Sequence, residues 1–120
     1  MAYKIDKPSI IEAAGNKPKI IREFIGRVNS KTDEVSIAKM TSPQGWTEPA
    51  QTPQFNEYTL VLKGTLQVKT KDSEYIVKEN ECIVTESGEW IQYSTPFEGG
   101  AEYVAVCAPA FSPEIVHRDE

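Results

Sequence analysis

Apolar and polar residues alternate in short segments through the second half of the chain. β-Branched and aromatic residues fill these segments, and turn residues separate them. The pattern predicts strands over 35–40, 57–63, 65–70, 74–78, 82–85, 89–94 and 101–108. Strands at such close and even spacing indicate an all-β sandwich or barrel.

The first third of the chain follows a different pattern. Residues 1–18 are polar and are interrupted by Pro8 and Pro18, so they predict an arm, with one helical turn around 9–14. In 19–28 the apolar residues recur at a spacing that fits a short amphipathic helix, and a strand with a bulge is the competing interpretation. The apolar positions are Ile20, Ile21, Phe24, Ile25 and Val28.

Two further segments are predicted to be irregular. Residues 41–55 contain three prolines, which lack the N–H that a sheet ladder requires, so this segment is a loop or edge. The tail is expected to contact the barrel through Phe111 and Ile115. We therefore expect one domain, with an arm and short helix or strand at 1–34, a barrel at 35–108 and a tail at 109–120.

Composition narrows the classes of function. The chain has 120 residues and a net charge of -5, and acidity argues against binding to nucleic acid. No apolar run reaches the length of a membrane span, so neither a membrane nor a nucleic acid is expected as a partner, and a cytoplasmic location is expected. Cys82 and Cys107 lie in strand-like segments, which favours buried reduced thiols over a disulfide.

The segment from Gly45 to Gly64 carries a recognisable spacing. The spacing begins at Gly45 and places Gln51 after five residues, Pro53 after one more, Glu57 after three and Gly64 after six. This spacing resembles the first motif of the cupin family, in which histidines occupy the positions of Gln51 and Pro53. The second cupin motif aligns from Asn80 to Thr95, where only Gly88 is identical and Ile91 occupies the position of the third histidine.

The segments EYTLVL, GEW and AFSP and the HRDE tail are also similar to small single-domain bacterial cupins of unassigned function. The resemblance implies a cupin-like double-stranded β-helix barrel, or jelly roll, of two antiparallel sheets. Members of the family often form dimers, and an unpaired sheet edge needs cover, so we expect a homodimer.

The resemblance also implies where a metal would bind. Cupins usually ligate transition metals with three histidines and a glutamate, and here those positions are Gln51, Pro53, Glu57 and Ile91. Proline and isoleucine side chains offer no ligand atom, so no tightly bound metal and no cofactor are expected. A weak site of Gln51, Glu57 and His117 is the alternative, and a solvated tail histidine is the simpler interpretation of His117.

Glu57 is the principal candidate for chemistry. In the family's orientation it points into the barrel, and a carboxyl in a partly apolar pocket has a raised pKa suited to a general acid or base, with Tyr93 as its partner. A structural hydrogen-bond acceptor is the alternative. The predicted ligand-binding residues are Gln51, Glu57, Thr59, Ile91 and Tyr93, with Trp46 at the pocket mouth or buried in a packing contact.

Three functions remain open at this stage. The first is metal-independent binding of a small organic molecule in the barrel. The second is an enzyme of isomerase, epimerase or lyase type that uses Glu57 as general acid or base. The third is a structural or interaction protein whose side chains fill the barrel.

Overall fold

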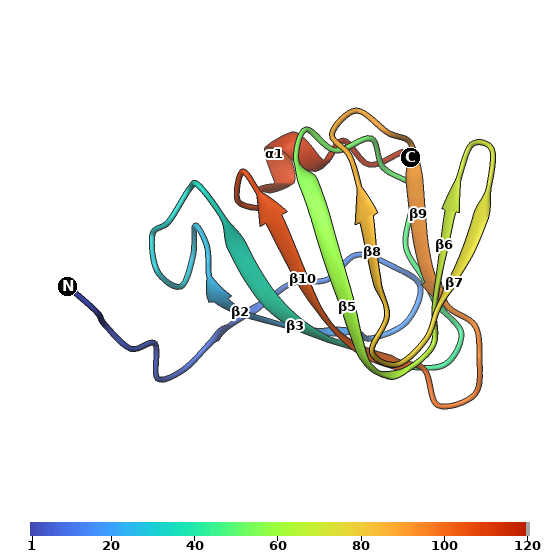
Figure 1. Ribbon diagram of the computed structural model, residues 1–120, viewed down its shortest axis with the longest axis horizontal. Helices are drawn as coiled ribbons and strands as arrows, with labels where there is room; N and C mark the ends of the chain where they lie inside the picture. Colours follow the sequence, from blue (N-terminus) through green and yellow to red (C-terminus); the bar gives the residue numbers. More distant parts are fainter. Residues whose placement is uncertain (120) are drawn as a thin grey trace.

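The computed structural model describes residues 1–119, and nearly every element in it is an antiparallel strand. The six-stranded sheet has the order β1-β2-β3-β10-β5-β8, and the four-stranded sheet has the order β4-β9-β6-β7. The strands of the first sheet are β1 (Ser9–Ile11), β2 (Ile20–Ile25), β3 (Ser36–Ser42), β10 (Ala101–Ala108), β5 (Asn56–Gly64) and β8 (Cys82–Thr85). Those of the second are β4 (Trp46–Thr47), β9 (Ile91–Thr95), β6 (Leu66–Thr70) and β7 (Glu74–Val77). The predicted all-β jelly roll is confirmed, and Figure 1 shows the two sheets facing each other.

Strict alternation places one side of each central strand inside the barrel. In β10, Ala101, Tyr103, Ala105 and Cys107 are buried, and the residues between them are half-buried. In β5, Glu57, Thr59 and Val61 are buried while Tyr58, Leu60 and Leu62 are exposed. Because successive side chains of a strand point to opposite faces, this alternation fixes which residues can reach the interior.

The hydrophobic core fills one part of the barrel. It includes residues from both sheets, namely Trp46, Val61, Leu66, Val68, Val77, Ile91, Tyr93, Ala101 and Tyr103. A second, smaller cluster joins Phe55 and Cys107 to Val116 of the helix α1 (Pro113–Val116). Phe111 and Ile115 pack against that cluster, as the sequence predicted. The helix itself was not predicted; Ser112 caps its N-terminus by accepting a hydrogen bond from the amide of Glu114 at 3.2 Å.

The predicted helix over 19–28 is wrong. This segment forms β2, which pairs with β1 on one side and β3 on the other. A register irregularity between Glu23 and Ile25 is the bulge of the competing interpretation. The helical turn expected around 9–14 is also wrong, because Ser9–Ile11 forms β1. Tertiary pairing with a neighbouring strand outweighs the local preference of both segments.

Two smaller expectations also need correction. The segment 41–55 is not wholly irregular, since Trp46–Thr47 forms β4 and pairs with β9. Both cysteines are free and Cys107 is buried, but Cys82 is exposed because it lies on the outer face of β8.

Among residues 1–119, no helix is long and apolar enough to span a membrane.

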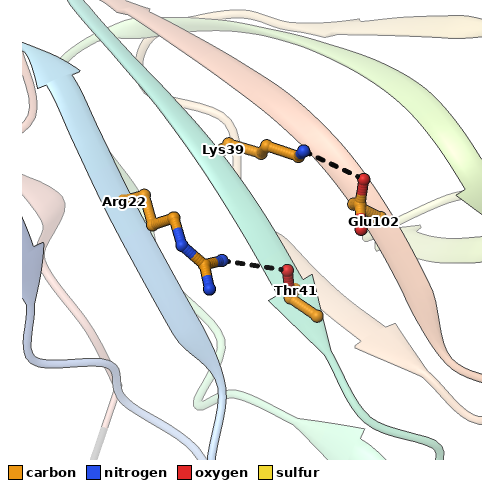
Figure 2. Close-up of polar contacts among 4 residues, drawn as sticks. All are labelled: Arg22, Lys39, Thr41 and Glu102. Carbon is orange, nitrogen blue, oxygen red and sulfur yellow. Dashed lines mark hydrogen bonds and ion pairs between the residues drawn. The ribbon is translucent and has the colours of Figure 1, made fainter. Parts of the chain in front are cut away.

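The outer face of the six-stranded sheet has a polar part and an apolar part. On β2, β3 and β10, Lys39 Nζ lies 3.2 Å from Glu102 Oε1, and Arg22 Nη1 donates to Thr41 Oγ1 at 3.4 Å (Figure 2). On β5 and β8 the outward side chains are apolar and exposed, namely Tyr58, Leu60, Leu62 and Val84. We call these four residues the outer apolar patch.

Candidate functional site

A cavity of about 70 Å³ lies inside the barrel, and residues of both sheets, the 41–55 segment and the tail line it. Part of its wall is apolar and includes Ile21, Met40, Phe55, Ala105 and Phe111. The polar part of the wall carries Lys19, Glu23, Ser36, Glu48, Gln51, Glu57, Tyr93, Tyr103 and Arg118. An apolar surface with a few convergent polar groups is the usual composition of a small-molecule site.

Glu57 and Tyr93 meet on the wall of this cavity. Strand β5 supplies Glu57, which is 9% exposed, and β9 supplies Tyr93. The Tyr93 hydroxyl donates to Glu57 Oε1 at 3.1 Å and lies 3.0 Å from Thr85 Oγ1. Burial raises the pKa of Glu57, although Lys19 and the hydrogen bond from Tyr93 oppose this rise. Burial and the charge of Glu57 raise the pKa of Tyr93, which is therefore a proton donor in this pair.

Lys19 supplies a cation to the same cavity. Its Nζ lies 4.0 Å from the centroid of the Trp46 ring and 5.3 Å from that of Tyr103. Such contacts stabilise a cation that is partly removed from water. Burial lowers the pKa of Lys19, but the charges of Tyr103, Glu48 and Glu57 outweigh burial, and its pKa is raised. Lys19 is therefore positively charged in the neutral pH range.

Glu48 and Arg118 each carry a buried polar atom without a partner. Among residues 1–119, Glu48 Oε2 and Arg118 Nε are the buried side-chain atoms that make no hydrogen bond. Glu48 is 8% exposed, and burial raises its pKa to about 7 against the opposing charge of Lys19. A buried polar atom without a partner costs about 1–3 kcal/mol, so both atoms are incomplete without a ligand or water.

Backbone pairing brings Arg118 to the cavity. Gln51 forms isolated bridges with both Ile91 and Arg118, and the amide of Asp119 donates to the carbonyl of Ala50 at 2.7 Å. These bonds attach the tail to the segment that carries Glu48 and Gln51. The guanidinium of Arg118 also lies 5.7 Å from the centroid of the Phe111 ring.

The structure places the predicted site residues in three groups. Glu57, Gln51 and Tyr93 line the cavity. Thr59, Ile91 and Trp46 are buried but are not part of the cavity wall, and Trp46, at 1% exposed, belongs to the core rather than to a mouth. His117 is exposed and its Nε2 lies 2.6 Å from Gln54 Oε1, so it is not brought to Gln51 and Glu57.

Six polar residues of the cavity were missed from the sequence, namely Lys19, Glu23, Ser36, Glu48, Tyr103 and Arg118. Tyr103 could have been found, because it shares the inward face of a predicted strand with Ala101 and Ala105. Lys19 is the first residue of the 19–28 segment, whose secondary structure was left open between helix and strand. Glu48 and Arg118 lie in segments without a periodic pattern, where sequence gives no signal of side-chain direction.

Comparison with solved structures identifies the fold as that of the cupins. The chain resembles a cupin-like protein of Thermotoga maritima with a TM-score of 0.73 and 7% identity, over 87% of this chain and 79% of that one. It resembles oxalate decarboxylase of Bacillus subtilis with a TM-score of 0.74 and 18% identity, over 97% and 31% of the two chains. The EutQ protein of Clostridium difficile gives a TM-score of 0.63 and 22% identity, over 79% and 66%. The chain therefore has the cupin fold, as its motif spacing predicted.

Comparison of sequences does not assign the chain to a family, because no known family model matches it. A curated relative, named endoribonuclease YbeY of Myxococcus xanthus (strain DK1622), is 38% identical over 101 residues, which cover 84% of this chain. The match spans 34% of that relative, so the chain corresponds to about a third of its length. The name describes the whole relative and does not assign its activity to the matched third.

The residues present do not fit the transition-metal centre that the fold family implies. The four matching positions hold Gln51, Pro53, Glu57 and Ile91, and two of these side chains have no ligand atom. Among residues 1–119, no group of three or more His, Cys, Asp or Glu side chains is arranged to hold a metal ion. These side chains therefore do not form a transition-metal centre of the kind that cupins use.

Proposed function

We propose that this protein binds a small organic molecule inside the barrel, without a tightly bound transition metal. The observation that carries the proposal is the pair of unpartnered atoms, Glu48 Oε2 and Arg118 Nε, on the wall of a buried cavity. Buried polar groups are normally hydrogen-bonded, so an unpaired acceptor and an unpaired donor in one cavity favour a ligand that completes both.

The same cavity argues against a barrel that is merely filled by side chains. A filled interior leaves few voids larger than a water molecule. Here about 70 Å³ stays open, although large residues such as Phe55, Tyr93 and Tyr103 surround it. The space holds several waters or a small ligand.

A cavity-filling variant tests this proposal. In Ala105→Leu, the larger side chain projects into the cavity that Ala105 lines. We expect small-molecule hits from a ligand-observed NMR screen of the wild-type protein to lose binding in Ala105→Leu. They should keep it in Val104→Leu, the neighbouring position on the opposite face of β10. Circular dichroism checks the fold of each variant, and Ala38→Val, at another lining position, serves if Ala105→Leu does not fold. Equal binding to wild type and to a folded cavity variant would overturn the proposal.

A second candidate is an enzyme that moves a proton, with Glu57 as general acid or base and Tyr93 as its hydrogen-bonding partner. The raised pKa of Glu57 favours this candidate, because a carboxyl that titrates nearer neutral pH is a more effective base. Exchange of a ligand's carbon-bound hydrogen with D₂O, followed by NMR, tests it. The exchange should vanish in Glu57→Gln while ligand binding persists; exchange that continues unchanged would exclude Glu57 as the base.

We further infer that the protein associates with a second copy of itself through the outer apolar patch. Tyr58, Leu60, Leu62 and Val84 lie on neighbouring strands, since Tyr58 pairs with Val84 in register. Contiguous exposed apolar surface of this kind commonly marks an interface. Opposite charges at Lys39 and Glu102, beside the patch, are suited to the rim of a two-fold contact.

We also propose that the protein is located in the cytoplasm. Its two free cysteines are compatible with a reducing compartment, and cell fractionation tests this location.

A further inference from the structure

The charged groups of the cavity are not paired with one another. Among residues 1–119, the ion pairs shorter than 4.0 Å are Lys4 with Asp6 and Lys39 with Glu102. Within that part of the chain, Lys19 and Arg118 therefore have no carboxylate at that distance, and Glu48 and Glu57 have no cation. Charges that are removed from water are usually paired, because desolvating a lone charge is costly.

These charges are nonetheless close enough to influence one another. Lys19 and Arg118 lower the pKa of Glu48 against the effects of burial and Glu57, and Glu48 and Glu57 raise that of Lys19. All four side chains line the one cavity. The empty space lies among two cations and three carboxyl groups that form no ion pair with one another; the third carboxyl, Glu23, already accepts hydrogen bonds from the amides of Val28 and Asn29.

Resting on the proposed binding function, we propose that the ligand is a small zwitterion, an amino acid or a similar amine-bearing carboxylic acid. Its carboxylate accepts a hydrogen bond from Arg118 Nε, and its ammonium donates to Glu48 Oε2. Within residues 1–119, these are the two fully buried side-chain atoms that make no hydrogen bond. Phe55, Phe111 and Met40 provide an apolar wall for the ligand's carbon chain.

The balance of charge separates a zwitterion from its alternatives. A simple organic anion would complete Arg118 but leave Glu48 Oε2 without a donor. A simple amine would complete Glu48 but leave Arg118 Nε without an acceptor. Either would also add a net charge to a cavity shielded from water, whereas a zwitterion adds none.

Ligands of equal size test the proposal on the wild-type protein. L-Alanine, L-lactate and L-alaninamide contain the same number of non-hydrogen atoms, and they present a zwitterion, an anion and a cation. We expect alanine to bind about tenfold or more tightly than either analogue, because a charge-assisted hydrogen bond contributes more than a neutral one. Ligand-observed NMR titration measures these affinities. β-Alanine and 4-aminobutyrate then show which separation of the two charges fits best.

Matched variants assign the two contacts. Glu48→Gln should weaken zwitterion binding about tenfold and remove the preference for alanine over lactate. Arg118→Gln should remove the preference for alanine over alaninamide. The controls Glu102→Gln and Arg22→Gln change the same residue types on the outer face of the six-stranded sheet (Figure 2), and they should leave both preferences unchanged.

The outcomes distinguish this proposal from the one on which it rests. If lactate or alaninamide binds as tightly as the zwitterions and Ala105→Leu abolishes that binding, the zwitterion proposal is wrong and ligand binding in the barrel stands. If neither these compounds nor a broad fragment set binds in a manner sensitive to Ala105→Leu, both proposals are wrong. A zwitterion preference lost in Glu48→Gln, and kept in both controls, supports the two together.

Discussion

At the scale of single residues, the carboxyl of Glu48 links the stability of the barrel to pH. Burial raises its pKa to about 7, from an ordinary value of 4.5. The folded protein therefore holds this proton more tightly than the unfolded chain does. Its contribution to stability is fully present below about pH 4.5 and is lost as pH rises through about 7. Burial also raises the pKa of Glu57.

The variant Glu48→Gln should remove the part of this dependence that belongs to Glu48. We expect the free energy of unfolding of the variant, relative to wild type, to rise by about 2–3 kcal/mol between about pH 5 and about pH 7.5. Urea unfolding of both proteins at the two pH values measures this difference. Glu102→Gln, at a half-buried carboxyl on the outer face of the six-stranded sheet, is the control. A difference that stays constant with pH would show that Glu48 titrates near its ordinary pKa in the folded protein.

Sequence predicts side-chain direction at this scale only where a residue lies in a periodic segment. Glu57 and Tyr93 could be placed inside the barrel because the cupin resemblance indicates which face of their strands points inward, and alternate residues of a strand share a face. Glu48 and Arg118 could not, because long-range backbone bonds such as Asp119 N–H to Ala50 O bring their segments together. Lys19 Nζ lies over the Trp46 ring, and no local pattern in the sequence links those two positions.

At the scale of elements, the strands from β5 to β10 were predictable and β1 and β2 were not. The central strands carry both alternation and flanking turn residues. β2 carries apolar residues at a spacing compatible with helix, and it becomes a strand because β1 and β3 offer backbone partners on both sides. Local sequence does not contain that pairing, so the competition between helix and strand could be settled only by tertiary structure.

The motif glycines mark turns that only a few residue types tolerate. Gly64, the last residue of β5, has φ of 79°, and a Cβ atom there would clash with the carbonyl oxygen of Gly100. Gly88 has φ of 87° with no atom within 4 Å of the corresponding position. Asn80 also has positive φ, at 65°, which agrees with its place at a family glycine position.

This contrast yields a matched pair of variants. Gly88→Ala carries only the cost of a left-handed backbone, about 1–2 kcal/mol. Gly64→Ala carries the same cost and a clash with backbone that cannot move aside easily, so we expect it to lose at least about 2 kcal/mol more. Thermal and urea unfolding of both variants measure the two losses. Equal losses would mean that the Gly64–Gly100 contact relaxes without cost.

At the scale of the whole molecule, the barrel separates two surfaces with different properties. Inside, the cavity combines charged groups with an apolar wall; outside, the six-stranded sheet presents the outer apolar patch. Alternation along β5 produces both, because Glu57 and Thr59 face inward while Tyr58 and Leu60 face outward. The same strand therefore serves the proposed ligand site on one face and the proposed interface on the other. Motif spacing could predict this barrel, but the order of its strands arises from contacts distant in sequence.

The outer apolar patch gives a prediction about assembly. We expect the wild-type protein to sediment as a dimer and Leu60→Glu to sediment as a monomer, because a buried, unpaired carboxylate at the centre of an apolar contact is costly. Ile76→Glu is the matched control; Ile76 is also an exposed apolar residue, but it lies on β7 of the other sheet. Ligand affinity should be the same in both variants if the interior and the patch act independently. A monomeric wild type, or a Leu60→Glu variant that remains dimeric, would show that the patch is not the contact between copies.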